Sequence, residues 1–213
     1  MNRRGFTLLF DKVVEYGKGF HKDVIFPLCL RLDQIYSERK IYLNGKPDQD
    51  SKIFKDTMRS FQKRIHRLTL RIQDKVNDLH KRIAHDLFEH ADVVLLPKFE
   101  TQAMSAKLKR KINAKSVRAM LGLKHYQFQQ TMLWHARKHG KSLIICNEAW
   151  TSKTASWTGE LHKGLGSSET IKSQGKIVSR DINGARGILL RALTKGLAPF
   201  SAISDKNVAV VAG

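Results

Sequence analysis

The sequence has few cysteines, few acidic residues and no long apolar run. Its 213 residues include only two cysteines, Cys29 and Cys146. Two thiols exclude a disulfide framework, and they also exclude a zinc site built from four cysteines. No apolar segment reaches the length of a membrane-spanning helix, and the first residues lack the apolar core of a secretory signal. These absences predict an intracellular protein in a reducing compartment, without a membrane partner.

The shortage of acidic residues leaves a large positive charge. Lysine and arginine number 39 against 19 aspartates and glutamates, which gives a formal net charge of +20. This excess predicts a polyanionic partner. It is concentrated in the second half, because no acid lies between Glu100 and Glu148. The basic residues in that interval are Lys107, Lys109, Arg110, Lys111, Lys115, Arg118, Lys124, Arg137, Lys138 and Lys141. A generic basic protein, such as a ribosomal one, is the alternative.

The first half of the chain predicts a hairpin followed by helices. Residues 5–10 and 13–16 are β-prone and flank a short turn. A helix is expected over residues 22–39. From Asp50 to Leu87, apolar residues recur every three or four positions, which predicts one long helix. Its apolar stripe needs a partner, and the helix at 22–39 is the candidate. His66, His80 and His85 on the long helix are interpreted as solvated surface histidines.

The second half of the chain predicts buried strands alternating with helices. Residues 91–96 and 143–146 are short apolar runs typical of buried parallel strands. Basic helices are expected at 105–120 and 125–139, and a last helix at 183–195. Residues 151–176 are interpreted as a loop or insert, and the tail from residue 198 is not assigned. This order predicts an α/β fold with central buried strands.

Three acidic residues follow or flank these elements. Glu100 and Glu148 come just after the two predicted strands, and Asp181 stands near the start of the last helix. Functional groups gather at the carboxyl ends of such strands. Acids close together in a basic protein repel one another unless a divalent cation bridges them, and carboxylate-held Mg²⁺ commonly assists phosphodiester cleavage. Asp181 as a helix cap and Glu148 as a surface acid are the alternatives.

Several short motifs resemble one protein family. TSKT at 151–154 and SRDINGARGILLRAL at 179–193 resemble the C-terminal part of the transposon-encoded TnpB proteins and their Fanzor relatives. LPKFETQAM at 96–104 looks like the second catalytic motif of that family, and VVEYGKG at 13–19 looks like its early hairpin. Members are RNA-guided DNA endonucleases with a RuvC-like domain of RNase H fold, interrupted by a zinc ribbon.

The resemblance implies a domain order and a set of site residues. Residues 1–150 would form a RuvC-like domain with a helical insertion, 151–178 a degenerate zinc-ribbon insert, and 179–213 the final RuvC motif, helix and tail. Glu100 matches the second RuvC carboxylate and Asp181 the third, so both would hold Mg²⁺. DNA and a guide RNA are the implied partners, in the nucleus or cytoplasm of a host cell or in a bacterial cytoplasm. Lys107, Lys109, Arg110, Lys111, Lys115 and Arg118 would contact nucleic acid.

The sequence departs from the family pattern at two places. The first catalytic Asp would fall just before Met1, so the first strand of the RuvC domain, which is normally central in the sheet, is missing. The zinc ligands would fall at Ala155, Thr158, Ile171 and Gln174, none of which binds zinc. We therefore expect no zinc, a mobile segment at 155–176 and difficulty in completing the sheet.

These departures favour a truncated, degenerate homologue that binds nucleic acid and cleaves it inefficiently. A non-catalytic nucleic-acid-binding regulator and a decayed reading frame are the alternatives. Among the tryptophans, Trp134 lies in a helical pattern and is expected in the core, whereas Trp157 is expected to be the most exposed.

Overall fold

The structure is a computed structural model, and it describes residues 6–9, 13–98, 114–146, 151, 153–162, 165, 168–194 and 208–212. A mixed five-stranded sheet forms its centre, in the order β2-β1-β7-β3-β4. The strands are β1 (Phe6–Leu9), β2 (Val13–Tyr16), β3 (Val93–Pro97), β4 (Ser142–Cys146) and β7 (Val208–Ala212). The mixed α/β class expected from the sequence is confirmed.

The expected hairpin and the expected parallel strands are both present. Strand β1 pairs antiparallel with β2, with Phe6 opposite Tyr16. Strands β3 and β4 run parallel, with Val93 opposite Ser142. All five residues of β3 are buried, because helices cover both faces of this part of the sheet. Gly17, which ends the hairpin, has a φ of 70°, a conformation that glycine adopts without a steric penalty.

The C-terminal strand β7 takes the central position in the sheet. It pairs antiparallel with β1 on one side and parallel with β3 on the other. Ala209 and Val211 point to one face of the sheet and Val210 to the other, and all three are buried. The unassigned tail is therefore a core strand, and it joins the β1–β2 hairpin to the β3–β4 pair. In the described part of the chain, β7 therefore lies at the centre of the sheet, where the sequence led us to expect a missing strand.

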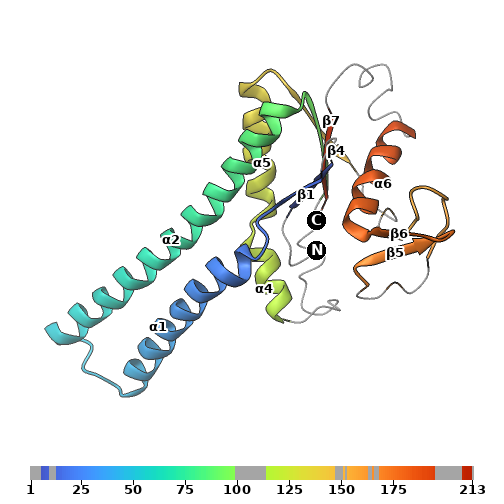
Figure 1. The fold of residues 1–213 in the computed structure, drawn as a ribbon. Coiled ribbons are helices and arrows are strands. Elements are labelled where there is room, and N and C mark those ends of the chain that lie inside the picture. The colour runs from blue at the N-terminus through green and yellow to red at the C-terminus, as the bar shows by residue number, and fades with distance from the viewer. Residues whose placement is uncertain are drawn as a thin grey trace.

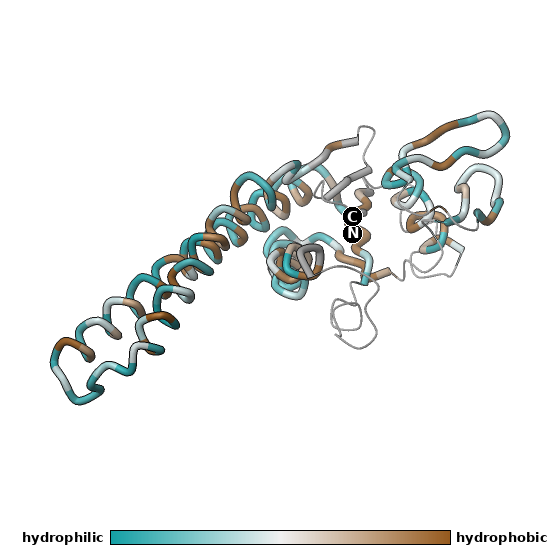
Figure 2. Tube along the Cα trace, turned by 90° about the horizontal axis from the view of Figure 1, so that it is seen from below, coloured by the Kyte–Doolittle hydropathy of each residue, from teal (hydrophilic) through white to brown (hydrophobic). Residues whose placement is uncertain are grey.

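Two helices form a long arm that extends from the sheet (Figures 1 and 2). A π-helical turn, η1 (Phe20–Ile25), leads into α1 (Phe26–Asn44), which packs against α2 (Lys52–His90). The ring of Tyr42 lies 6.2 Å from that of Phe54 and 6.1 Å from that of Phe61, and Arg64 pairs with Glu38 at 2.9 Å. The expected partner for the long helix is confirmed. With 39 residues, α2 is roughly 58 Å long.

The two faces of the sheet are covered by different helices. On one face, α2 and α5 (His125–Lys138) bury the larger apolar cluster, which includes Phe88, Phe128 and Met132. On the other face, α6 (Arg180–Thr194) covers a smaller cluster around Leu95 and Ile188. The short helix α4 (Ala114–Gly122) lies beside η1. Figure 1 shows α6 on the side opposite α2 and α5.

The segment expected to be a loop contains regular structure. Strands β5 (Thr170–Ser173) and β6 (Lys176–Ser179) form an antiparallel hairpin, with Gln174 and Gly175 in the turn at positive φ. The interpretation of these residues as a loop is wrong. The reason is that alternate residues of β5 are buried, including Ile171 and Ser173, which gives the hairpin a small core of its own. The expected mobility of residues 155–176 stays a prediction.

Candidate nucleic-acid interface

Asp181 is the one predicted catalytic residue that lies among the described residues. It stands in the first turn of α6, directly after β6, and its side chain is partly buried. Helix α6 packs against β7, β1 and β3. Glu100 lies outside the described residues, three positions after β3 in the sequence. The predicted proximity of Glu100 and Asp181 therefore stays a prediction.

The RDINGAR motif has a structural role beside Asp181. The side chain of Asn183, 0% exposed, donates from Nδ2 to the carbonyl oxygens of Thr151 (3.3 Å) and Thr154 (2.9 Å). Its Oδ1 accepts from the backbone N–H of Ser156 at 2.8 Å. A Cβ added to Gly187 would lie 3.0 Å from the Thr151 Cβ. The asparagine and this glycine therefore hold Thr151, Thr154 and Ser156 close to α6.

The insert is held by apolar and hydroxyl side chains at and next to the positions expected for zinc ligands. Ala155 and Ile171 are both fully buried. The Thr158 and Ser173 hydroxyl oxygens are 2.9 Å apart, and Ser173 donates to Glu160 Oε2 at 2.6 Å. Trp157 donates from its indole N–H to the Ser173 carbonyl at 3.3 Å. Trp157 is thus half-buried, and the expectation that it is the most exposed tryptophan is wrong. Among the described residues, no three His, Cys, Asp or Glu side chains gather as a metal site.

Of the predicted nucleic-acid contacts, only Arg118 has a described side chain. Its guanidinium forms a two-pronged pair with Asp33 of α1, at 2.5 Å and 2.9 Å. Hydrogen bonding to Arg118 lowers the pKa of Asp33, and the same bonds raise the pKa of Arg118. Lys115 lies in α4. Lys107, Lys109, Arg110 and Lys111 lie outside the described residues. Arg118 therefore joins α4 to α1, and its contact with nucleic acid stays a prediction.

Two histidines are buried where α2 meets α5. The imidazole of His80 bonds through Nε2 to the Leu123 carbonyl at 3.0 Å, and its ring lies 5.1 Å from that of Phe128. Burial lowers the pKa of both His80 and His125 to about 4. The expectation of a surface histidine is wrong for His80, because it continues the stripe of α2 that faces α5 and the sheet. His66 and His85 are exposed, as expected.

The exposed face of α5 carries two aromatic residues, one of which was expected in the core. Trp134, expected in the core, is 58% exposed, and Tyr126 is 75% exposed. Lys138 Nζ lies 5.1 Å above the Trp134 ring. The sequence offered one signal for this surface, which is the lack of any acid in α5. Helical periodicity places Trp134 near apolar positions but does not say which face the partner helix covers.

The fold and its motifs define a mixed α/β protein with a helical arm and a small β-hairpin between β4 and α6. The model of the Cas12f1-like TNB domain matches residues 125–188, from α5 into α6. Among curated proteins, a putative transposase of Paramecium bursaria Chlorella virus 1 is 36% identical over 141 residues, which covers 66% of this chain and 31% of that protein. Two TnpB-like proteins of Acanthamoeba polyphaga mimivirus are each 30% identical over 149 residues, covering 69% of this chain and 28% of each relative.

These matches identify the chain as a homologue of the TnpB-type transposon proteins, which confirms the resemblance found in the motifs. The chain spans less than a third of the length of the curated relatives it matches. Among the described residues, no helix is both long and apolar enough to cross a membrane.

Proposed function

We propose that this chain is the RuvC-like part of a TnpB/Fanzor-type, RNA-guided DNA endonuclease homologue, and that by itself it binds nucleic acid with little cleavage. The observation that carries the proposal is the acid-free basic interval between Glu100 and Glu148, which overlaps the TNB match at residues 125–188. Lysine and arginine contacts to phosphates release counterions, which favours binding. DNA is the proposed substrate, and a guide RNA is the second proposed partner.

The sheet supports the RuvC-like assignment through the place of β7. The resemblance puts a first strand at the centre of the sheet, and here β7 occupies that centre between β1 and β3. We propose that β7 substitutes structurally for that strand. It carries no acid, since its residues are Val208, Ala209, Val210, Val211 and Ala212. It therefore supplies strand pairing and core side chains without supplying a carboxylate.

The chemistry follows from the acids matched in this sequence. Glu100 and Asp181 are the proposed Mg²⁺ ligands, and a bound Mg²⁺ would stabilise the charge that develops on the cleaved phosphate. Of these two proposed ligands only Asp181 lies among the described residues, and no cluster of three His, Cys, Asp or Glu side chains is found in that part of the chain. With two of the three carboxylates, we expect slow cleavage. We also propose that the insert binds no zinc.

The first test measures cleavage and binding separately. The purified full chain is incubated with labelled DNA and Mg²⁺ or Mn²⁺, beside the variants Glu100→Ala and Asp181→Ala. We expect little cleavage by any of the three. Efficient cleavage that both substitutions abolish would contradict the proposed low activity while supporting the proposed site.

The second test addresses binding through charge. Charge reversal at Lys107, Lys109 and Lys111 should weaken binding and flatten its salt dependence. The reason is that fewer counterions are released on binding when phosphate contacts are lost. Charge reversal at Lys52, Lys55 and Lys63 on the arm is the control. Equal binding by both triple variants would refute the proposed interface.

Two other functions are distinguished by simple measurements. A non-catalytic regulator, favoured by the incomplete acid set, would bind nucleic acid tightly and show no cleavage with any metal. A decayed reading frame would show no amides protected from hydrogen exchange. The similar viral proteins support a host-cell nucleus or cytoplasm as the proposed location.

A further inference from the structure

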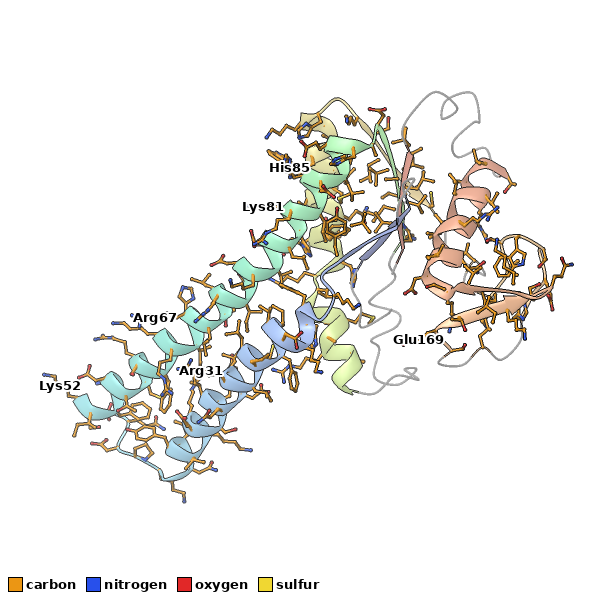
Figure 3. All side chains as sticks on the ribbon, in the orientation of Figure 1. Arg31, Lys52, Arg67, Lys81, His85 and Glu169 are labelled. Carbon is orange, nitrogen blue, oxygen red and sulfur yellow. The ribbon has the colours of Figure 1, made fainter. Side chains whose placement is uncertain are left out.

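The outer side of the α2–α5 pair carries a groove of about 670 Å³. Helix α5 contributes Gln130, Trp134, His135 and Lys138 to its lining, and α2 contributes Lys81 and His85. Lys81 and His85 lie toward the sheet end of α2, whereas Lys52 and Arg67 lie farther along the arm (Figure 3). The groove is separate from Asp181, because α6 covers the opposite face of the sheet.

Two exposed aromatic rings lie on one side of α5. Tyr126, Gln130, Trp134 and Lys138 follow one another at four-residue intervals, so they line one side of the helix, and all four are exposed. Tyr126 and Trp134 are about 12 Å apart along the helix axis. The rings of Trp134 and His135 form a T-shaped pair with a centroid distance of 4.8 Å. His135 packs beside His139 at 5.9 Å. Because these contacts already restrict the Trp134 side chain, little further conformational entropy is lost when a flat ligand stacks on the indole.

The charge around these rings is positive. His135 is buried, and burial lowers its pKa; the nearby His139, Lys138, His85 and Lys81 lower that pKa further. The facing acids lie on α2 and have partners there. Glu89 is 3.6 Å from His85, Asp78 pairs with Arg82, and Asp86 is 3.5 Å from His90. Helix α5 has no acid. The lysines that line the groove thus face no acid from α5.

From this combination we propose that the Trp134 groove binds single-stranded nucleic acid, with bases stacked on Trp134 and Tyr126 and phosphates held by Lys81 and Lys138. The inference rests on the proposed function and adds a site to it. Aromatic faces stack on any base, and lysines contact the backbone of any strand, so the site tolerates different sequences. A duplex keeps its bases stacked internally and offers only its phosphates. The alternative occupant of the groove is a partner protein with an acidic, apolar surface, whose binding would not depend on free bases.

The test uses the purified full chain and fluorescently labelled oligothymidylate, oligouridylate and a duplex, with anisotropy as the readout. Trp134→Ala should weaken single-strand binding by about 5- to 150-fold, the range of one lost stacking contact, and should leave duplex binding unchanged. Trp134→Phe should retain most of the affinity. Tighter binding of oligouridylate would assign the groove to RNA, and tighter binding of oligothymidylate would assign it to DNA.

A charge-matched pair of variants separates the groove from the general basic surface. Lys81→Glu should weaken single-strand binding and lower its salt dependence by about one counterion. Lys52→Glu makes the same change at the far end of α2 and should alter affinity less than about twofold.

The outcomes distinguish the two proposals. Unchanged binding of both oligothymidylate and oligouridylate by Trp134→Ala, beside tight binding of at least one of them by the parent, overturns the groove and leaves the proposed function intact. This result would point to a protein partner. Equal losses for single strand and duplex also overturn stacking. A parent chain that binds no nucleic acid overturns both proposals. Because Trp134 is exposed, circular dichroism should show each variant folded.

Discussion

The two faces of the sheet are held by different kinds of interaction. The face covered by α2 and α5 buries large apolar side chains, with Phe88, Phe128 and Met132 at its centre. The face covered by α6 has a smaller apolar cluster, and buried hydrogen bonds from Asn183 attach the neighbouring segment. The difference shows how a segment with little apolar core of its own can be attached. A buried amide with three partners holds this segment to α6.

The strand β7 serves both faces, so damage to it should have the largest effect. Val211→Asp places a carboxylate among buried apolar side chains and should cost about 4 kcal/mol or more, enough to unfold a marginally stable domain. The same substitution at Ile41, which is 72% exposed on α1, should cost less than about 1 kcal/mol. Urea unfolding measures both. Similar losses for the two variants would show that β7 is not part of the core.

The α6 face should depend on Asn183. Asn183→Ala leaves two carbonyls and one N–H without their partner, and it should lower the free energy of unfolding by about 2–3 kcal/mol. Hydrogen exchange should accelerate in residues 151–179 and change little in α5. Asn77 accepts a single bond from Gln127 Nε2 at 2.8 Å on the other side of the sheet, so Asn77→Ala is the control. An equal loss in that control would mean that Asn183 has no special role.

The α2–α5 face should weaken in acid. Burial lowers the pKa of His80 to about 4, whereas the unfolded side chain keeps its ordinary value of 6.5. The neutral His80 imidazole contributes fully to the free energy of unfolding above pH 6.5. This contribution declines as pH falls toward 4, because only the unfolded state gains the proton. The loss should reach about 2 kcal/mol at pH 5 for one such histidine. His125 has the same low value, so His80→Gln should remove about half of the decline. An unchanged pH profile in this variant would refute the buried neutral imidazole.

Local patterns predicted the regular elements well. The three- and four-residue repeat of apolar side chains located α2, and the runs VVLL and LIIC located β3 and β4. They failed where the outcome depended on a distant partner. The tail residues 208–212 are apolar. Nothing near them in the sequence shows that they pair with residues 7–9 and 93–95. Hairpin β5–β6 was missed because its strands, TIKS and KIVS, contain lysine and serine and no apolar run like those of the equally short β1 and β2.

The candidate site shows the same limit. The RDINGAR and TSKT motifs pointed to Asp181 and to its neighbourhood, and the structure adds Asn183 as the residue that holds that neighbourhood together. The groove at Trp134 could not be located from periodicity, because a helix repeat does not reveal which of its sides a neighbour covers. The one sequence feature that indicated this surface was the run of basic residues without an acid.

By itself, the sequence determined the charge, the positions of the long helices and the likeness to TnpB-type proteins, since these depend on composition and on residues near one another in the chain. Only the tertiary structure decided that β7 completes the sheet, that His80 is buried and that Trp134 faces outward. Each of these depends on contacts between segments far apart in sequence, and the free energy of such contacts comes from packing that no local pattern encodes.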